Sequence, residues 1–188
     1  MEPWQIALIV VVLAVVAGGA VLLLFRQRQR TERLTGRFGP EYRHALEDHG
    51  DRRAAETELE ARQRRVEELE IRTLTAEEHD RFASAWRRVQ ARFVDDPSGT
   101  ISEADRLVEQ LMETRGYPVA EGFEQRAADV SVGHGQVAIE YREAHAIAER
   151  HAAEGVDTET LRQALVHYRA LFDELLEVDQ RAPVEASS

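Results

Sequence analysis

Residues 4–25 read WQIALIVVVLAVVAGGAVLLLF, and this stretch decides how the whole chain is organised. Nineteen of its 22 residues are apolar, two are glycine, one is glutamine, and none is charged. As an α-helix, the uncharged run from Ile6 to Phe25 would be about 30 Å long, which matches the hydrocarbon layer of a bilayer. Trp4 precedes the run and suits the aromatic belt at a membrane interface. We therefore predict an N-terminal transmembrane anchor over residues 1–25, with Trp4, Ile6 and Phe25 as anchor residues.

A cleaved signal peptide is the alternative explanation of this run. The segment before it holds Glu2 and no cation, and the run is longer than the apolar region of a typical signal peptide. Arginine follows the run, where a signal peptide would have its cleavage site. These three features favour a retained anchor.

A basic cluster follows the apolar run directly and consists of Arg26, Arg28, Arg30, Arg33 and Arg37. No basic residue precedes the run. By the positive-inside rule, we expect a single-pass protein of the cell (inner) membrane, with its N-terminus outside and its C-terminal domain in the cytoplasm. The same arginines are candidates for binding lipid headgroups, although a plain topology signal explains them more simply.

The composition of residues 26–188 narrows the choice of function. This part is 37% apolar and 36% charged, and the chain has no cysteine, which excludes disulfides, thiolate metal sites and cysteine catalysis. The net charge is −11 for the chain and −14 for residues 44–188, so nucleic acid is not the expected partner. Every basic residue is arginine, as in GC-rich bacterial genomes, so we expect a bacterial source.

Residues 26–73 are predicted to be a basic juxtamembrane segment followed by a charged helical stalk. In residues 51–72, 13 of 22 side chains are charged, and large apolar residues are sparse. This pattern predicts a solvated, membrane-proximal helix, and a weak coiled coil is left open. Ala14 and Gly18 form a pair of small residues four apart, which leaves open a homo-oligomer through the transmembrane or stalk helix.

Residues 74–178 are predicted to fold as a small helical bundle, which makes the fold class all-α. Thr75 and Glu78 have the spacing of a capping box, and no run of alternating β-branched residues predicts a strand. Apolar residues spaced three and four apart predict four amphipathic helices that can bury one another, at residues 76–94, 100–115, 136–152 and 158–178. The tail at 179–188 is predicted to be disordered.

No arrangement of residues predicts a reaction. One Glu-x-x-His pair exists, Glu41 and His44, whereas a di-iron bundle needs two such pairs plus two further glutamates. His145 and Glu149 share a helix face, but such lone pairs are common in charged helices. We therefore expect no catalytic residue, no metal, no cofactor and no enzyme activity.

Several short motifs together resemble a family of uncharacterised bacterial single-pass membrane proteins. The resemblance covers nearly the whole chain and rests on five segments: RFGPEY at 37–42, RFVDDP at 92–97, RGYP at 115–118, FEQRAAD at 123–129 and HYRALF at 167–172. Residues 133–135, Gly-His-Gly, depart from the Asp-His-Pro expected there. The resemblance implies a single membrane span and no activity.

Together these patterns predict a membrane-anchored interaction or scaffold protein with a cytoplasmic acidic helical domain. Its expected partners are the lipid bilayer and an unknown protein. One alternative is a small-ligand sensor or enzyme with a pocket in the bundle that uses His145, Glu149 or His167. The other is an accessory subunit of a larger membrane complex.

Overall fold

The computed structural model describes residues 3–177, and side chains from residue 17 onward. The described residues form helices joined by turns and loops, with no strand, which confirms the predicted all-α class. The helices are α1 (Pro3–Phe38), α2 (Pro40–His49), α3 (Arg52–Glu67), α4 (Ala76–Arg92), α5 (Pro97–Arg115), α6 (Phe123–Ser131), α7 (Gly135–Glu154) and α8 (Thr158–Glu177).

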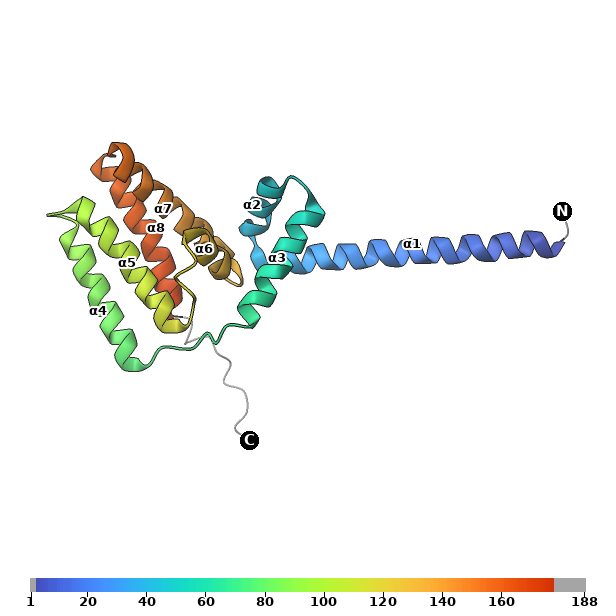
Figure 1. Cartoon of the computed structure of the whole chain (residues 1–188), viewed down its shortest axis with the longest axis horizontal. Coiled ribbons are helices and arrows are strands. Elements are labelled where there is room, and N and C mark those ends of the chain that lie inside the picture. Colours follow the sequence, from blue (N-terminus) through green and yellow to red (C-terminus); the bar gives the residue numbers. More distant parts are fainter. Residues whose placement is uncertain (1–2, 178–188) are drawn as a thin grey trace, which may run out of the picture.

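Helices α4, α5, α7 and α8 form the predicted bundle, with the short α6 packed against α7 (Figure 1). The apolar faces read from the sequence meet in one core. At its centre the rings of Trp86 and Phe172 stack with centroids 4.6 Å apart, and Tyr141 and Tyr168 are fully buried. Burial of apolar surface is the main favourable contribution to folding, and each of these aromatic side chains buries a large area.

Local signals set the bundle's helix ends. The capping box is present: the Glu78 amide donates to Thr75 Oγ1 at 3.2 Å, and the Thr75 amide donates to Glu78 Oε2 at 3.0 Å. Asp96 caps α5 by accepting from the Gly99 amide at 2.9 Å. Helix α5 ends at Gly116, whose φ of +98° suits glycine, and a Cβ there would lie 2.5 Å from the Glu70 carbonyl oxygen.

The segment of residues 26–73 differs from the solvated stalk that its charge pattern predicts. Helix α1 runs to Phe38, and after the turn at Gly39 helices α2 and α3 fold back against it. They enclose a second, smaller core of Leu34, Phe38, Tyr42, Ala45, Ala55, Leu59 and Val132. The few apolar residues of α3 are sufficient to pack this helix, because the helices they pack against belong to the same chain.

Toward its N-terminal end, α1 projects from the folded body as a single helix (Figure 1). Within the part of the chain that the structure describes, no helix has the length and hydrophobicity of a membrane span. Trp4 and Ile6 lie outside the residues whose side chains are described, as do most positions of the predicted span. Phe25 is described and is 58% exposed. The tail at 179–188 also lies outside the described residues.

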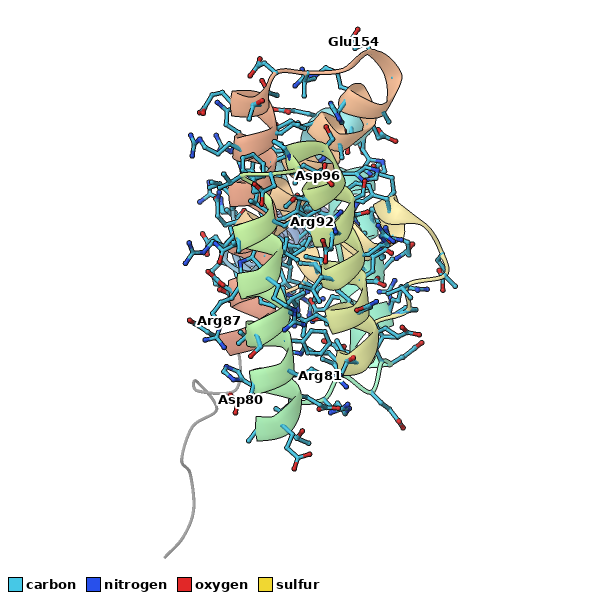
Figure 2. The ribbon with its side chains drawn as sticks, turned by 90° about the vertical axis from the view of Figure 1, so that its left-hand side faces the viewer. Asp80, Arg81, Arg87, Arg92, Asp96 and Glu154 are labelled. Carbon is cyan, nitrogen blue, oxygen red and sulfur yellow. The ribbon has the colours of Figure 1, made fainter. Side chains whose placement is uncertain are left out.

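The end of the bundle farthest from α1 presents α4 and α5 (Figure 2). Its side chains carry both signs of charge, for example Asp80, Arg81 and Arg87. Arg92 donates to Asp96 at 3.0 Å on this side. The charges at this end are therefore mixed.

Candidate functional site: an ionic joint between helices α1 to α3 and the bundle

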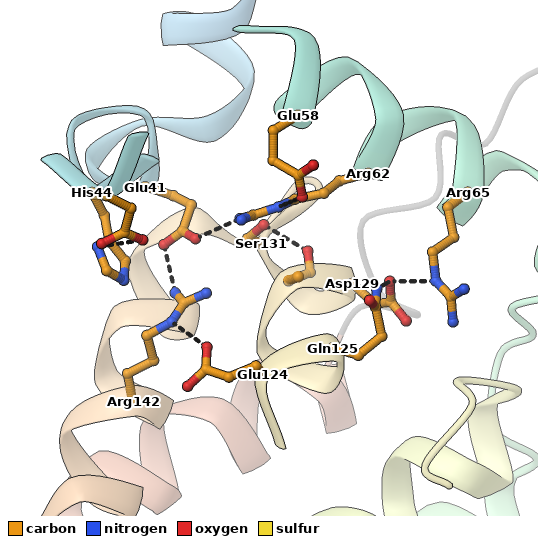
Figure 3. Close-up of polar contacts among 12 residues, drawn as sticks. Glu41, His44, Glu58, Arg62, Arg65, Glu124, Gln125, Asp129, Ser131 and Arg142 are labelled. Carbon is orange, nitrogen blue, oxygen red and sulfur yellow. Dashed lines mark hydrogen bonds and ion pairs between the residues drawn. The ribbon is translucent and has the colours of Figure 1, made fainter. Parts of the chain in front are cut away.

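A cluster of charged residues connects the two cores, and we call it the ionic joint. It consists of Glu41 on α2, Arg62 and Arg65 on α3, Asp129 on α6 and Arg142 on α7 (Figure 3). Glu41 and Asp129 are both fully buried. Buried carboxylates need charged partners, and here the partners come from other helices.

Glu41 is held by two guanidinium groups. Arg62 donates to Glu41 Oε1 at 3.0 Å, and Arg142 donates to Oε2 at 2.7 Å. The arginine side chains are only 13% and 16% exposed, so water screens these pairs little. One carboxylate therefore connects α2, α3 and the bundle helix α7 (Figure 3).

Asp129 forms the second half of the joint. Its Oδ1 accepts from Arg65 Nε at 3.0 Å and from Gln125 Nε2 at 2.8 Å. Arg65 also donates to Glu121 at 2.8 Å. The hydrogen bond to Glu121, followed by that to Asp129, raises the pKa of the Arg65 guanidinium. Helix α3 is thus attached to α6 and to the loop before it.

Beside these ion pairs, the backbones of α1 and α7 are in direct contact. Gly135, the first residue of α7, lies against the end of α1, and a Cβ there would be 1.9 Å from the Phe38 carbonyl oxygen. Only glycine allows the two backbones to approach this closely. The start of α7 is therefore fixed directly against the last turn of α1.

Chemically, the joint holds helices together and offers no reactive group. Each described carboxylate in it is neutralised by arginine, and arginine cannot serve as a proton acceptor at ordinary pH. Among the described residues, no group of three or more His, Asp or Glu side chains is arranged to hold a metal ion. The arrangement fixes the direction of α1 relative to the bundle.

Glu41 and His44, the one Glu-x-x-His pair noted in the sequence, have different partners in the structure. Glu41 faces the two arginines, whereas His44 lies 3.4 Å from Asp48. A shared metal is thereby disfavoured, because both carboxylate oxygens of Glu41 already accept hydrogen bonds.

The other predicted polar groups also have individual partners. His145 lies 3.5 Å from Glu149 and stacks on the Phe123 ring, with centroids 3.6 Å apart. His167 pairs with Glu140. His145 and His167 thus each have a carboxylate partner of their own.

The interior of the bundle contains a polar group that sequence reasoning missed. Arg126 is 7% exposed, donates to the Tyr141 hydroxyl at 3.2 Å and pairs with Glu109 at 2.6 Å. Burial raises the pKa of Tyr141 to about 12 and also raises that of Tyr168. The tyrosines therefore stay neutral, and Arg126 is held between aromatic side chains and a carboxylate.

The basic cluster after the apolar run is divided by the fold. Arg30 lies 2.9 Å from Glu60 on α3, and Arg33 pairs with the same carboxylate at 3.2 Å. Arg26, Arg28 and Arg37 are exposed. Two of the five predicted headgroup residues thus stabilise the fold of the chain itself.

Sequence reasoning missed the joint, although two of the quoted motifs contribute to it. Glu41 lies in RFGPEY and Asp129 in FEQRAAD, but their partners on α3 and α7 are ordinary arginines among many. A glutamate one residue after a helix-starting proline gives no sign that it will be buried. No protein-family model matches the chain, and no curated protein or solved structure is significantly similar to it.

Proposed function

We propose that the chain is a membrane-anchored interaction or scaffold protein that holds an acidic helical domain at the cytoplasmic face of the cell membrane. The observation that carries the proposal is the exposed apolar end of α1. Five consecutive large apolar side chains, Val21 to Phe25, are 51–66% exposed. They continue an uncharged sequence that begins at residue 4. Exposed apolar side chains of this kind require a covering environment, and the uncharged sequence of residues 4–25, taken as a helix, has the length of a bilayer's hydrocarbon layer.

The ionic joint supports a scaffold role. A tethered partner gains effective concentration only when the tether allows it to reach its target. Here α1 continues without interruption from Pro3 to Phe38 and ends against Gly135 of the bundle. The bundle is therefore presented in a defined orientation to the anchor helix, which suits a protein that positions a partner.

The distribution of charge supports a cytoplasmic location for the bundle. The exposed Arg26 and Arg28 lie where the apolar run ends, and nothing basic precedes it. Residues 44–188 carry a net charge of −14, which favours a basic protein partner over nucleic acid.

In-cell crosslinking with mass spectrometry of the tagged, full-length protein tests the proposal. We expect a stoichiometric protein partner crosslinked to the bundle, residues 74–178, in the membrane fraction. A chain that lacks residues 1–25 is the control and should lose the membrane fraction. Crosslinked membranes that yield the chain alone would refute the scaffold role.

A further inference from the structure

A groove lies between α1 and the start of α3, at the level where the apolar run ends. Its volume is about 880 Å³. Leu24, Gln27 and Arg28 line it from α1, and Arg52 and Arg53 line it from α3. We propose that this headgroup groove binds the phosphate of an anionic phospholipid. The proposal rests on the membrane anchor proposed above.

The charges in the groove favour a phosphate. Arg28, Arg52 and Arg53 are exposed, and among the described side chains none of the three has an ion-pair partner. Arg30, which also lines the groove, is already paired with Glu56 and Glu60. Three guanidinium groups are thus available, and a guanidinium can bind two phosphate oxygens at once.

Carboxylates in the groove offset this charge only in part, because four arginines and three carboxylates line it. Asp51 accepts from the Ala54 amide at 2.9 Å and so caps α3. Glu56 is 5% exposed and accepts hydrogen bonds from Thr31 and Tyr42 at 2.6 and 3.0 Å. Glu32 and Asp51 are the exposed carboxylates in the lining, and both oppose an anion.

The position of the groove selects a lipid as the source of the phosphate. Leu24 belongs to the exposed apolar end of α1 and lines the same groove as the arginines. A lipid bound there would place its acyl chains along Leu24 and its headgroup between the helices. The cytoplasmic leaflet carries the anionic lipids that such a site requires.

The fold also distinguishes this site from a topology signal. Topology depends on arginines within about 15–20 residues of a membrane span, and Arg52 and Arg53 lie farther along the chain than that. The turn between α2 and α3 nevertheless returns them to the level of Leu24. A lipid site explains this placement.

The test uses the purified full-length chain and two measurements. Flotation with pure phosphatidylcholine vesicles first measures the anchor alone. Native mass spectrometry in non-ionic detergent then measures binding of phosphatidylglycerol and of phosphatidylcholine. The variants are R52Q/R53Q, the matched control R87Q/R88Q on the exposed face of α4, and E32Q.

We expect wild type to bind phosphatidylglycerol in preference to phosphatidylcholine. R52Q/R53Q should weaken phosphatidylglycerol binding about 30-fold, which corresponds to about 1 kcal/mol for each arginine. R87Q/R88Q should bind as wild type does. E32Q removes the opposing charge without loss of a guanidinium and should strengthen binding about fivefold.

Failure of the membrane anchor and failure of the headgroup groove give different results in this experiment. A chain that does not float with phosphatidylcholine vesicles would refute the anchor, and with it the proposed function. A chain that floats, but whose phosphatidylglycerol binding is the same in R52Q/R53Q and R87Q/R88Q, would overturn the groove alone. Inorganic phosphate that binds as tightly as phosphatidylglycerol, and whose binding is also lost in R52Q/R53Q, would likewise overturn it, because the groove would then be a site for free phosphate.

Discussion

Replacing Glu41 with glutamine should loosen the packing of α2 and α3 and leave the bundle intact. Glutamine keeps the shape of the side chain but removes the charge that neutralises Arg62 and Arg142. Glu41 is fully buried, and both arginine side chains are less than 20% exposed. Two desolvated cations would thus lose their shared counter-ion.

The magnitude follows from this burial. Removing one partner of a buried ion pair costs about 3–5 kcal/mol. Glu58→Gln is the matched control, because Glu58 binds the same Arg62 at 3.1 Å but is 42% exposed. A solvent-exposed i,i+4 pair of this kind contributes about 0.3–0.5 kcal/mol. Burial therefore predicts about a tenfold difference in free energy between two glutamates that share one arginine.

Hydrogen–deuterium exchange of the full chain measures the effect helix by helix. At about tenfold per 1.4 kcal/mol, Glu41→Gln should speed exchange of α2 and α3 amides by roughly 100-fold or more where exchange reports opening of the joint. Amides of α4, α5 and α8 should keep their rates, because those helices belong to the other core. Glu58→Gln should leave every rate close to that of wild type.

Two results would refute the reasoning. Equal effects of Glu41→Gln and Glu58→Gln would show that burial of Glu41 does not matter. Faster exchange throughout α4, α5 and α8 would show that the joint does not form a separate unit of stability.

Three further predictions concern packing and titration. Gly135→Ala should loosen the contact between α1 and α7, because the new Cβ would lie 1.9 Å from the Phe38 carbonyl oxygen. Gly36→Ala is the control: its Cβ would meet nothing within 4 Å, so it should be neutral or stabilise α1 by about 0.5–1 kcal/mol. Thermal unfolding followed by circular dichroism compares the two variants. Phe172→Ala should lower the free energy of unfolding by about 3–5 kcal/mol, because it leaves a cavity beside Trp86. Urea unfolding monitored by tryptophan fluorescence measures this loss, and a loss below about 1 kcal/mol would contradict the core position of Phe172. Burial raises the pKa of Tyr141 from 10.0 to about 12, so the hydroxyl loses its proton at lower pH in the unfolded chain than in the folded one, and the free energy of unfolding should fall as the pH rises from about 10 to 12. The absorbance of the native protein at 295 nm should stay flat through pH 10. A rise there would show that the tyrosines are accessible to solvent.

The bundle could be predicted because its signals are local. Helix-spaced apolar residues, the Thr75–Glu78 capping box and the glycine stop at Gly116 each depend on a few neighbours in sequence. Phe172 could thus be assigned to the core, although the sequence could not show that its ring stacks on Trp86.

The joint could not be predicted because its contacts are long-range. Glu41 meets Arg142 across 101 positions, and Arg65 meets Asp129 across 64. Many arginines occur in this chain, and composition alone does not indicate which two will face a buried carboxylate. Charge density likewise suggested a solvated stalk for α3, since sparse apolar residues such as Leu59 do not reveal that neighbouring helices will cover them.

The central claim is that residues 4–25 anchor the chain in the cell membrane with its bundle on the cytoplasmic side. The chain has no cysteine, so Ser102→Cys at an exposed position of α5 introduces a unique thiol. The direct measurement is labelling of this thiol by a membrane-impermeant maleimide in intact and in lysed spheroplasts, on protein recovered from alkali-washed membranes. Anchoring with this orientation predicts protein in the washed membranes that is labelled only after lysis. Labelling of intact spheroplasts would contradict the orientation, and absence of the protein from the washed membranes would contradict the anchor.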